Sequence, residues 1–287
     1  MTQSTVQLGL PKGRMQEGVL KLLKDAGIDI HLGSRNYRPV VAMEGLSAKL
    51  LKPQNIVEML HVGSRDVGFA GADWVAELGV DLVELVDTGM DPVRLVAAAP
   101  EAMVPDGKLP ATSLVVASEY ERLTRQWIAD TGMDATFVHS YGATEVFPPE
   151  DADCIVDNTA TGSTLDANGL VIVDLLMRSS TRLYAHPAAL DDPAKREVID
   201  RLVLLVESVI AARRRVMLEV NVDRDHLEQV IEYLPCMREP TISSLRGEEG
   251  FAVKAAVPRE DLTVIIPELK ARGGTDIVVT ELAQIIP

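Results

Sequence analysis

The segment formed by residues 153–168 restricts the possible folds more than any other part of the chain. Residues 154–156 (Cys-Ile-Val) form a short apolar run, which predicts a buried strand of a parallel sheet. Asp157 ends this run, and a loop of small and hydroxylated residues around Gly162 follows it. Residues 164–168 then have the composition of a helix start. A strand, a tight loop and a helix in this order indicate one unit of an α/β sheet.

The same loop has the composition of an anion-binding site. Backbone N–H groups converge where a polar loop meets a helix N-terminus, and the helix dipole favours negative charge there. Ser163 or Thr164 is the expected N-cap, and Gly162 allows close backbone approach or a positive φ. The loop lacks the Gly-Lys-Ser/Thr of a Walker loop and the three glycines of a dinucleotide fingerprint. An ordinary strand-to-helix turn is the alternative interpretation.

Composition excludes several other classes of protein. With 287 residues the chain can hold two or three domains, and its net charge of -15 argues against a general nucleic-acid binder. An anionic substrate would therefore need a locally basic site or a metal. The N-terminus is polar and no apolar run approaches the ~18 residues of a membrane span, so we expect a cytoplasmic protein without membrane contact. Cys154 and Cys236 lie far apart and are expected to be small hydrophobic residues in a reducing compartment.

Strand-like and helical segments alternate over the first two thirds of the chain. The expected strands are residues 6–10, a short buried strand between the glycines of residues 62–73, and residues 82–86, 93–98, 114–117, 135–138, 154–156, 170–175 and 181–185. The expected helices are residues 15–26, 74–78 with Asp73 as a possible cap, 119–130 and 193–213. The alternation predicts two α/β lobes with a ligand cleft between them.

The last third of the chain has a different order of elements. We expect strands at residues 216–222, 241–245, 251–257 and 276–280, and helices at residues 224–233 and 259–272. The order βαββαβ is that of a ferredoxin-like unit. A small domain after a complete two-lobed core is more plausible as a regulatory or assembly module than as a catalytic one.

Five motifs in a fixed order carry a resemblance to a known family. They are Pro-Lys-Gly-Arg at 11–14, Asp-Val-Gly-Phe-Ala-Gly-Ala-Asp at 66–73, Gly-Ala-Thr-Glu-Val at 142–146, Asp-x-x-x-Thr-Gly-x-Thr-Leu-x-Ala-Asn-Gly-Leu at 157–170 and Pro-Thr-Ile-Ser-Ser-Leu at 240–245. With these motifs, nearly the whole chain resembles the ATP phosphoribosyltransferase family. The length and the βαββαβ tail resemble the long, self-regulated form of that family.

The resemblance implies an α/β fold with two lobes of periplasmic-binding-protein-like (type II) architecture and an interlobe cleft. Lobe I would comprise residues 1–93 and 178–212, and lobe II residues 94–177 with the phosphate loop. Residues 213–287 would form a C-terminal ferredoxin-like, ACT-like regulatory domain.

The resemblance also implies a reaction. Adenine N1 of ATP would attack C1 of phosphoribosyl pyrophosphate (PRPP) and release pyrophosphate, with Mg²⁺ as cofactor and without a covalent enzyme nucleophile. This is the first step of L-histidine biosynthesis, with feedback inhibition by histidine and AMP as a further candidate inhibitor. The family implies a homo-hexamer built from dimers.

Site residues carry over from the matching motifs. The expected PRPP-binding residues are Asp157, Asn158, Thr159, Ala160, Thr161, Gly162, Ser163, Thr164 and Leu165. The expected ATP-binding residues are Lys12, Gly13, Arg14, Lys52, Gly71, Asp73 and Tyr120. Glu145 and Asp157 are the expected metal ligands and, with Lys12, the expected catalytic residues. The effector site would include Asn221, Thr241 and Ser243.

The resemblance gives a more specific expectation for three of these positions. Tyr120 is expected to stack on the adenine or to lie at its edge. Lys52 stands where many relatives have arginine, and Asn221 where some relatives have an acid that holds the effector amine.

Two other functions fit the same pattern. A two-lobed small-molecule or amino-acid sensor has the same lobes and cleft but no turnover, and a phosphoribosyltransferase for another base keeps the loop but changes the acceptor. Release of pyrophosphate from PRPP in the presence of ATP separates the sensor from the enzyme, and a panel of bases identifies the acceptor.

Overall fold

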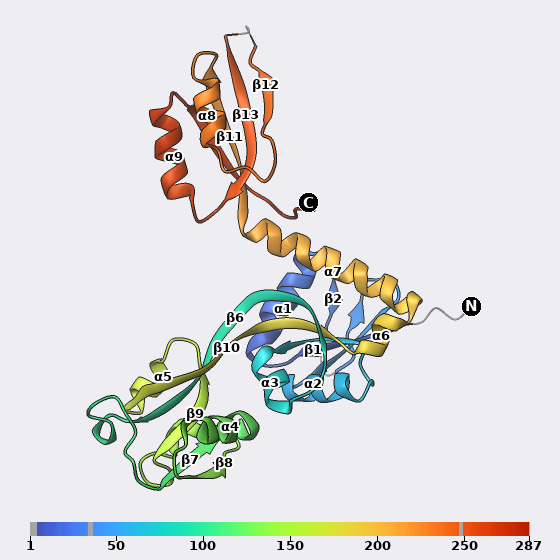
Figure 1. The fold of residues 1–287 in the computed structure, drawn as a ribbon. Helices are drawn as coiled ribbons and strands as arrows, with labels where there is room; N and C mark the ends of the chain where they lie inside the picture. Colours follow the sequence, from blue (N-terminus) through green and yellow to red (C-terminus); the bar gives the residue numbers. More distant parts are fainter. Residues whose placement is uncertain (1–4, 34–36, 247–248, 287) are drawn as a thin grey trace. The chain divides into compact units, whose positions relative to one another are not determined.

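The computed structural model describes residues 5–33, 37–246 and 249–286, and the chain divides into two compact units (Figure 1). Unit 1 comprises Met1–Lys21 and Ile28–Arg201, and unit 2 comprises Leu22–Gly27 and Leu202–Pro287. Both predicted lobes fall in unit 1, except that residues 22–27 and 202–212 of predicted lobe I belong to unit 2. The predicted regulatory domain also falls in unit 2.

Unit 1 is built on one eight-stranded sheet, which confirms the predicted α/β class. In sheet order its strands are β4 (Leu46–Leu51), β1 (Val6–Pro11), β5 (Val67–Gly71), β10 (Leu170–Ala185), β6 (Val83–Pro100), β9 (Cys154–Thr159), β7 (Leu114–Ser118) and β8 (Ala135–His139). Pairing is parallel at both ends of the sheet, whereas β10 and β6 run antiparallel to each other and to their outer neighbours. We call the part with β4, β1 and β5 lobe I, and the part with β9, β7 and β8 lobe II.

Helices follow the strands in both lobes. They are α1 (Arg14–Asp25), α2 (Pro53–His61), α3 (Ala72–Leu78), α4 (Glu121–Thr131), α5 (Ser163–Ala167), α6 (Pro187–Asp191) and α7 (Pro193–Arg213), with 3₁₀ turns η1 (Glu101–Met103) and η2 (Thr144–Val146). A small two-stranded sheet pairs β2 (Ile30–His31) with β3 (Val40–Val41). The apolar positions that predicted α1, Val19, Leu22 and Leu23, are fully buried, as the helical spacing requires.

The prediction of four short strands around the lobe boundaries was wrong. Residues 82–86 and 93–98 belong to one strand of 18 residues, β6, and residues 170–175 and 181–185 to one strand of 16 residues, β10. Figure 1 shows the two strands running side by side between the lobes. Their polar middles pair with each other across bulges, Ser179 opposite Val93 and Thr181 opposite Met90. Their hydrogen-bond partners lie about ninety residues away in sequence, so no local pattern predicts these strands.

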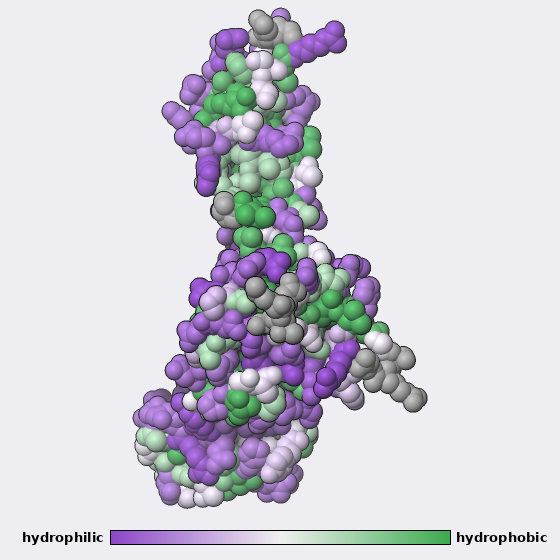
Figure 2. Space-filling model, turned by 90° about the vertical axis from the view of Figure 1, so that its right-hand side faces the viewer, coloured by the Kyte–Doolittle hydropathy of each residue, from purple (hydrophilic) through white to green (hydrophobic). Residues whose placement is uncertain are grey.

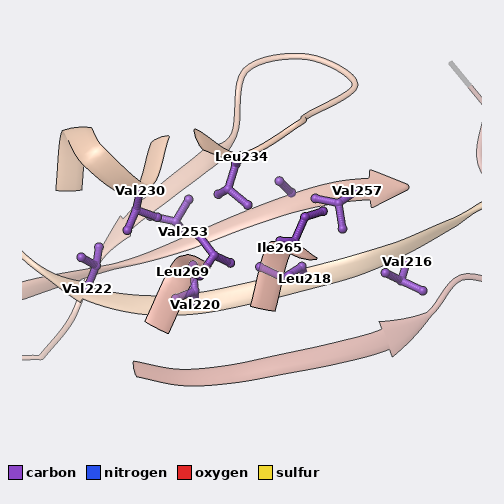
Figure 3. Packing of buried hydrophobic residues seen from close by; sticks show 11 residues of the cluster. Val216, Leu218, Val220, Val222, Val230, Leu234, Val253, Val257, Ile265 and Leu269 are labelled. Atoms are coloured by element: carbon purple, nitrogen blue, oxygen red, sulfur yellow. The ribbon is translucent and has the colours of Figure 1, made fainter. Parts of the chain in front are cut away.

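Unit 2 has the predicted βαββαβ order. Its elements are β11 (Arg215–Asp223), α8 (Leu227–Tyr233), β12 (Thr241–Ser244), β13 (Gly250–Pro258), α9 (Leu262–Ala271) and β14 (Thr275–Glu281), and the antiparallel sheet order is β12-β13-β11-β14. Val216, Leu218, Val220 and Val222 alternate with half-buried residues along β11 and face the helices. Figure 3 shows them packing with residues of β13, α8 and α9 in a core of aliphatic side chains.

The surface seen in Figure 2 is largely hydrophilic, as expected for a chain with many charged residues. Hydrophilic residues cover most of the face of unit 1 that Figure 2 shows. In the described part of the chain, every helix is too short or too polar to cross a bilayer.

Candidate active site

A cavity of about 260 Å³ lies in unit 1 and joins three of the motifs. The turn after β1 contributes Lys12 and Arg14, the β5–α3 junction contributes Gly71 and Asp73, and the end of β9 contributes Asn158. The other residues of its wall are Met15, Pro53, Trp74, Asp91, Val93, Ser179, Ser180 and Thr181. Lobe I, lobe II and the two long strands therefore all line one cavity.

The basic side of the cavity is the β1–α1 turn. The backbone N–H of Lys12 donates to the carbonyl of Leu51 (2.8 Å), and the positive φ of Gly13 (77°) turns the chain into α1. The Lys12 ammonium lies 3.4 Å from the centre of the Tyr37 ring, and Arg14 is exposed at the start of the helix. These two cations supply the local positive charge that an acidic chain needs in order to bind an anion. The predicted Lys52 is exposed just before α2 and does not belong to the cavity wall.

The predicted phosphate loop connects β9 to α5. Gly162 is the N-cap of α5, with a φ of 95°, and the expectation that Ser163 or Thr164 caps the helix was wrong. The reason is the left-handed turn, which only glycine adopts without strain. The Gly162 N–H donates to the Thr159 hydroxyl (3.0 Å), and the hydroxyls of Thr161 and Ser163 lie 3.0 Å apart.

Most residues of this loop are exposed, whereas Leu165 is buried and holds the loop on the sheet. Its exposed residues are Ala160, Thr161, Ser163 and Thr164. Leu165 is 4% exposed and packs with Val96, Ala98 and Ile155, so it fixes α5 on the sheet. The hydroxyls of Thr161, Ser163 and Thr164 therefore lie at the surface of a loop that Leu165 anchors to the sheet.

Asp157 is half-buried beside other acids. Burial raises the pKa of Asp157 to about 6, its hydrogen bond from the Asn158 N–H (2.7 Å) lowers it, and the nearby charges of Glu145 and Glu119 raise it. Glu145 lies in η2, which the buried hydroxyls of Ser140 and Thr144 hold through a 2.8 Å hydrogen bond. The structure thus brings the two predicted metal ligands, Asp157 and Glu145, close together.

Asp157 and Glu145 can supply only some of the ligands that a magnesium ion needs. Among the described residues, no group of three or more His, Cys, Asp or Glu side chains is arranged to hold a metal. Mg²⁺ commonly binds one or two carboxylates together with substrate phosphates and water, so Asp157 and Glu145 beside the predicted phosphate loop match that donor set.

The structure changes the interpretation of two predicted ATP-binding residues. Tyr120 is fully buried and its ring stacks on Trp74 with 4.7 Å between ring centres, so the ring is not a surface on which adenine stacks. Asp73 lies inside α3, after the N-cap Gly71, and does not cap the helix. The Asp73 carboxylate instead accepts hydrogen bonds from the Tyr120 hydroxyl (2.7 Å) and the Ser179 hydroxyl (2.7 Å).

Ser179 is a site residue that the sequence analysis missed. It is 5% exposed, lines the cavity from β10 and lies 106 residues from Asp73 along the chain. Asp91 and Thr181 were also missed; the Thr181 hydroxyl donates to the Asp91 carboxylate (2.8 Å) in the same wall. A serine in a strand carries no local signal, since only the pairing of β10 with its neighbours brings it to the cavity.

The three predicted effector residues share one region of unit 2. Asn221 of β11 and Ser243 of β12 are both opposite Ala252 of the intervening strand β13, and Thr241 is opposite Lys254 in the next row. Residues directly opposite in neighbouring strands project on the same face of the sheet. The Asn221 amide donates to the Asp276 carboxylate (3.1 Å), so an acid lies beside this row although position 221 is not acidic.

The fold and the cavity define a two-lobed α/β protein with a polar cavity between its lobes. A family model described as ATP phosphoribosyltransferase matches residues 52–208, and a model described as HisG, C-terminal domain matches residues 212–284. The chain belongs to the ATP phosphoribosyltransferase family, and it is an enzyme of the pentosyltransferase class.

Curated relatives agree with this over the full length. An ATP phosphoribosyltransferase from Chlorobium phaeobacteroides is 36% identical over 99% of this chain and 98% of its own length. Another from Pelotomaculum thermopropionicum is 36% identical over 98% of this chain and 99% of its own length.

A solved structure shares the fold of part of the chain. The ATP phosphoribosyl transferase (HisG:HisZ) complex from Thermotoga maritima includes a chain that matches 71% of this one, with 99% of its own length covered, a TM-score of 0.62 and 24% identity.

Proposed function

We propose that the chain transfers the phosphoribosyl group of PRPP to N1 of the adenine of ATP and releases pyrophosphate, the first step of L-histidine biosynthesis. Membership in the family supports the reaction. The observation that carries the assignment of the site is the cavity itself, which joins Lys12 and Arg14, Asp73, and Asn158 at the start of the phosphate loop. We also propose a cytoplasmic location, which is consistent with membership in a biosynthetic enzyme family.

In this reaction the protein mainly aligns the two substrates and stabilises charge, and it does not need to supply a covalent nucleophile. The lone pair of adenine N1 forms a bond to C1 of the ribose while the C1–oxygen bond to pyrophosphate breaks and its electron pair leaves with the pyrophosphate. Positive charge develops on the ribose and negative charge on the leaving group. Fixed positive groups near the pyrophosphate and a rigid hold on both substrates therefore lower the barrier.

Each part of the site has a proposed task. Backbone N–H groups and hydroxyls of the loop from Asn158 to Leu165 bind the 5-phosphate, and Asp157 accepts hydrogen bonds from the ribose hydroxyls. Lys12 and Arg14 bind the pyrophosphate or the triphosphate, and their position in the cavity wall is consistent with this. Glu145 and Asp157 would hold Mg²⁺, which supplies charge neutralisation of phosphate oxygens when bound.

The direct test is turnover. The purified chain is mixed with ATP, PRPP and Mg²⁺, and pyrophosphate release and the absorbance of phosphoribosyl-ATP are followed together. Stoichiometric formation of both products supports the proposal. PRPP binding without pyrophosphate release would contradict it in favour of a sensor, and pyrophosphate release only with another base would reassign the acceptor.

We also propose that histidine inhibits the enzyme by binding to unit 2 at Asn221, Thr241 and Ser243. Replacing Thr241 with valine removes a hydroxyl while keeping the shape, so we expect about ten-fold more histidine to be needed for half inhibition, with kcat unchanged. The control is Ser244→Ala, which removes a hydroxyl from the residue after Ser243, on the opposite face of the same strand. If histidine inhibits both Thr241→Val and Ser243→Ala as strongly as it inhibits the unmodified chain, the effector site lies elsewhere.

The assembly that we propose is a homo-hexamer built from dimers. Each chain has a mass of 31.1 kDa, so light scattering after size-exclusion chromatography distinguishes monomer, dimer and hexamer directly. A mass that stays at one or two chains with and without histidine would contradict the hexamer.

A further inference from the structure

A chain of hydrogen bonds links the two lobes through the hydroxyl of Tyr120. The Asn158 amide of lobe II donates to this hydroxyl (2.9 Å), and the hydroxyl donates to the Asp73 carboxylate of lobe I (2.7 Å). The other carboxylate oxygen of Asp73 accepts from the Ser179 hydroxyl (2.7 Å), which also accepts from the Asp73 N–H (3.0 Å). One phenol oxygen therefore bonds a residue of each lobe.

The direction of these bonds is set by chemistry. Tyr120 has one hydroxyl hydrogen and Asp73 is the stronger acceptor, so the Tyr120 oxygen is left to accept from the Asn158 amide. Burial and the charge of Asp73 raise the pKa of Tyr120, which keeps the hydrogen in place. A hydrogen bond in which the acceptor is a charged carboxylate in a water-poor site is stronger than one at the surface.

The tyrosine is held rigidly from two sides. Its ring stacks on Trp74, and its backbone N–H donates to the Ser118 hydroxyl (2.9 Å), which itself donates to the carbonyl of Val156 in β9 (2.6 Å). Tyr120 is 0% exposed and does not line the cavity, whereas Asn158 and Asp73 do. Asn158 and Asp73 hydrogen-bond to the same fixed phenol oxygen, so a change in the strength of one bond changes the strength of the other.

We infer that the Tyr120 hydroxyl is a positioning group that couples the phosphoribosyl side of the site to the nucleotide side. Asn158 follows Asp157 and opens the phosphate loop, and Asp73 stands on the proposed nucleotide wall. A ligand that orders the Asn158 side orients Asp73 for the other ligand, and the effect is reciprocal because it is a coupling free energy between two binding equilibria. This inference rests on the proposed function for the identity of the two ligands.

The test uses two ligands that cannot react together. Ribose 5-phosphate has no leaving group, so its affinity for the full-length chain can be measured by calorimetry with and without saturating ATP. We expect ATP to strengthen ribose 5-phosphate binding about five-fold or more in the unmodified chain, and ribose 5-phosphate to strengthen ATP binding by the same factor. In Tyr120→Phe we expect this factor to fall to about one, because phenylalanine keeps the stack on Trp74 but loses both hydrogen bonds.

Two further variants make the test specific. Tyr184→Phe removes the hydroxyl of another buried tyrosine of unit 1 that does not line the cavity, and it should keep the full factor. Asn158→Ala removes the lobe II end of the chain of bonds and should lose the factor even if Tyr120→Phe does not fold.

The outcomes separate this inference from the proposed function. If both ligands bind but the unmodified chain shows no coupling, or if Tyr120→Phe or Asn158→Ala keeps the full factor, the inference is overturned while the proposed function stands. If neither ligand binds, the proposed function fails and the inference fails with it. A factor that Tyr184→Phe also loses would show a general effect of tyrosine hydroxyls and would overturn the specific role of Tyr120.

Discussion

Replacing Asp157 with asparagine is expected to lower kcat about 100-fold while leaving the melting temperature unchanged or raised. The amide keeps the size of the side chain but loses the charge that would hold ribose hydroxyls and Mg²⁺. The carboxylate is half-buried near Glu145 and Glu119, so the fold bears a cost for keeping it ionised. Steady-state kinetics and a thermal melt of the same preparation measure both effects.

The raised pKa of Asp157 gives this prediction a pH signature. Because the pKa of Asp157 in the folded chain is about 6, the carboxylate takes up a proton as the pH falls through 6, and kcat/KM should fall in the same range. For stability the sign is opposite: the folded state binds this proton more tightly than the unfolded chain, so the group destabilises the fold above pH 6 and this cost disappears as the pH falls toward 4. Asp157→Asn should lose its share of both pH dependences.

A charge-matched control shows whether the effect is specific. Asp166→Asn also removes one carboxylate in the same region, from an exposed position in the first turn of α5, and it should change kcat by no more than about two-fold. Unchanged kcat in Asp157→Asn would remove this residue from the mechanism. A lower melting temperature would instead mean that Asp157 is a structural group.

Replacing Gly162 with valine is expected to weaken PRPP binding at least about ten-fold, because a left-handed backbone costs an L-residue roughly 1–2 kcal/mol and a β-branched one more. The φ of Gly162 is 95°, and an added Cβ would meet only the Asp166 carboxylate, at 3.9 Å. The variant therefore strains the loop backbone rather than filling space. The loop is expected to relax toward a negative φ, which moves the N–H groups and hydroxyls that bind the 5-phosphate.

Gly169 is a matched control at the other end of α5. Its φ is also positive (66°), and an added Cβ would meet nothing within 4 Å. Gly169→Val should lower the melting temperature by a comparable amount but leave PRPP affinity unchanged, as measured by titration calorimetry without ATP. Equal PRPP affinity in Gly162→Val and the unmodified chain would refute the cradle assignment. If both glycine variants lose the same amount of PRPP affinity, the loss comes from a general loosening of α5.

Local patterns in the sequence determined much of this protein. The alternation of Val216, Leu218, Val220 and Val222 predicts an inward face with a period of two, and the structure buries that face. The apolar run before Asp157 and the glycine-containing loop after it predict the β9–α5 unit for the same reason. These features depend on neighbours in sequence, so composition and spacing are sufficient to predict them.

Tertiary structure alone decided the rest. The middles of β6 and β10 are strands because each completes the hydrogen bonds of the other, and their own residues do not favour extended structure. The family resemblance predicts that Tyr120 contacts adenine, yet the side chain is buried against Trp74 and its hydroxyl donates to Asp73. Ser179 reaches the same carboxylate across 106 residues of chain. A side chain's partners are set by strand pairing and burial, which join distant segments, and no local pattern of residues contains that information.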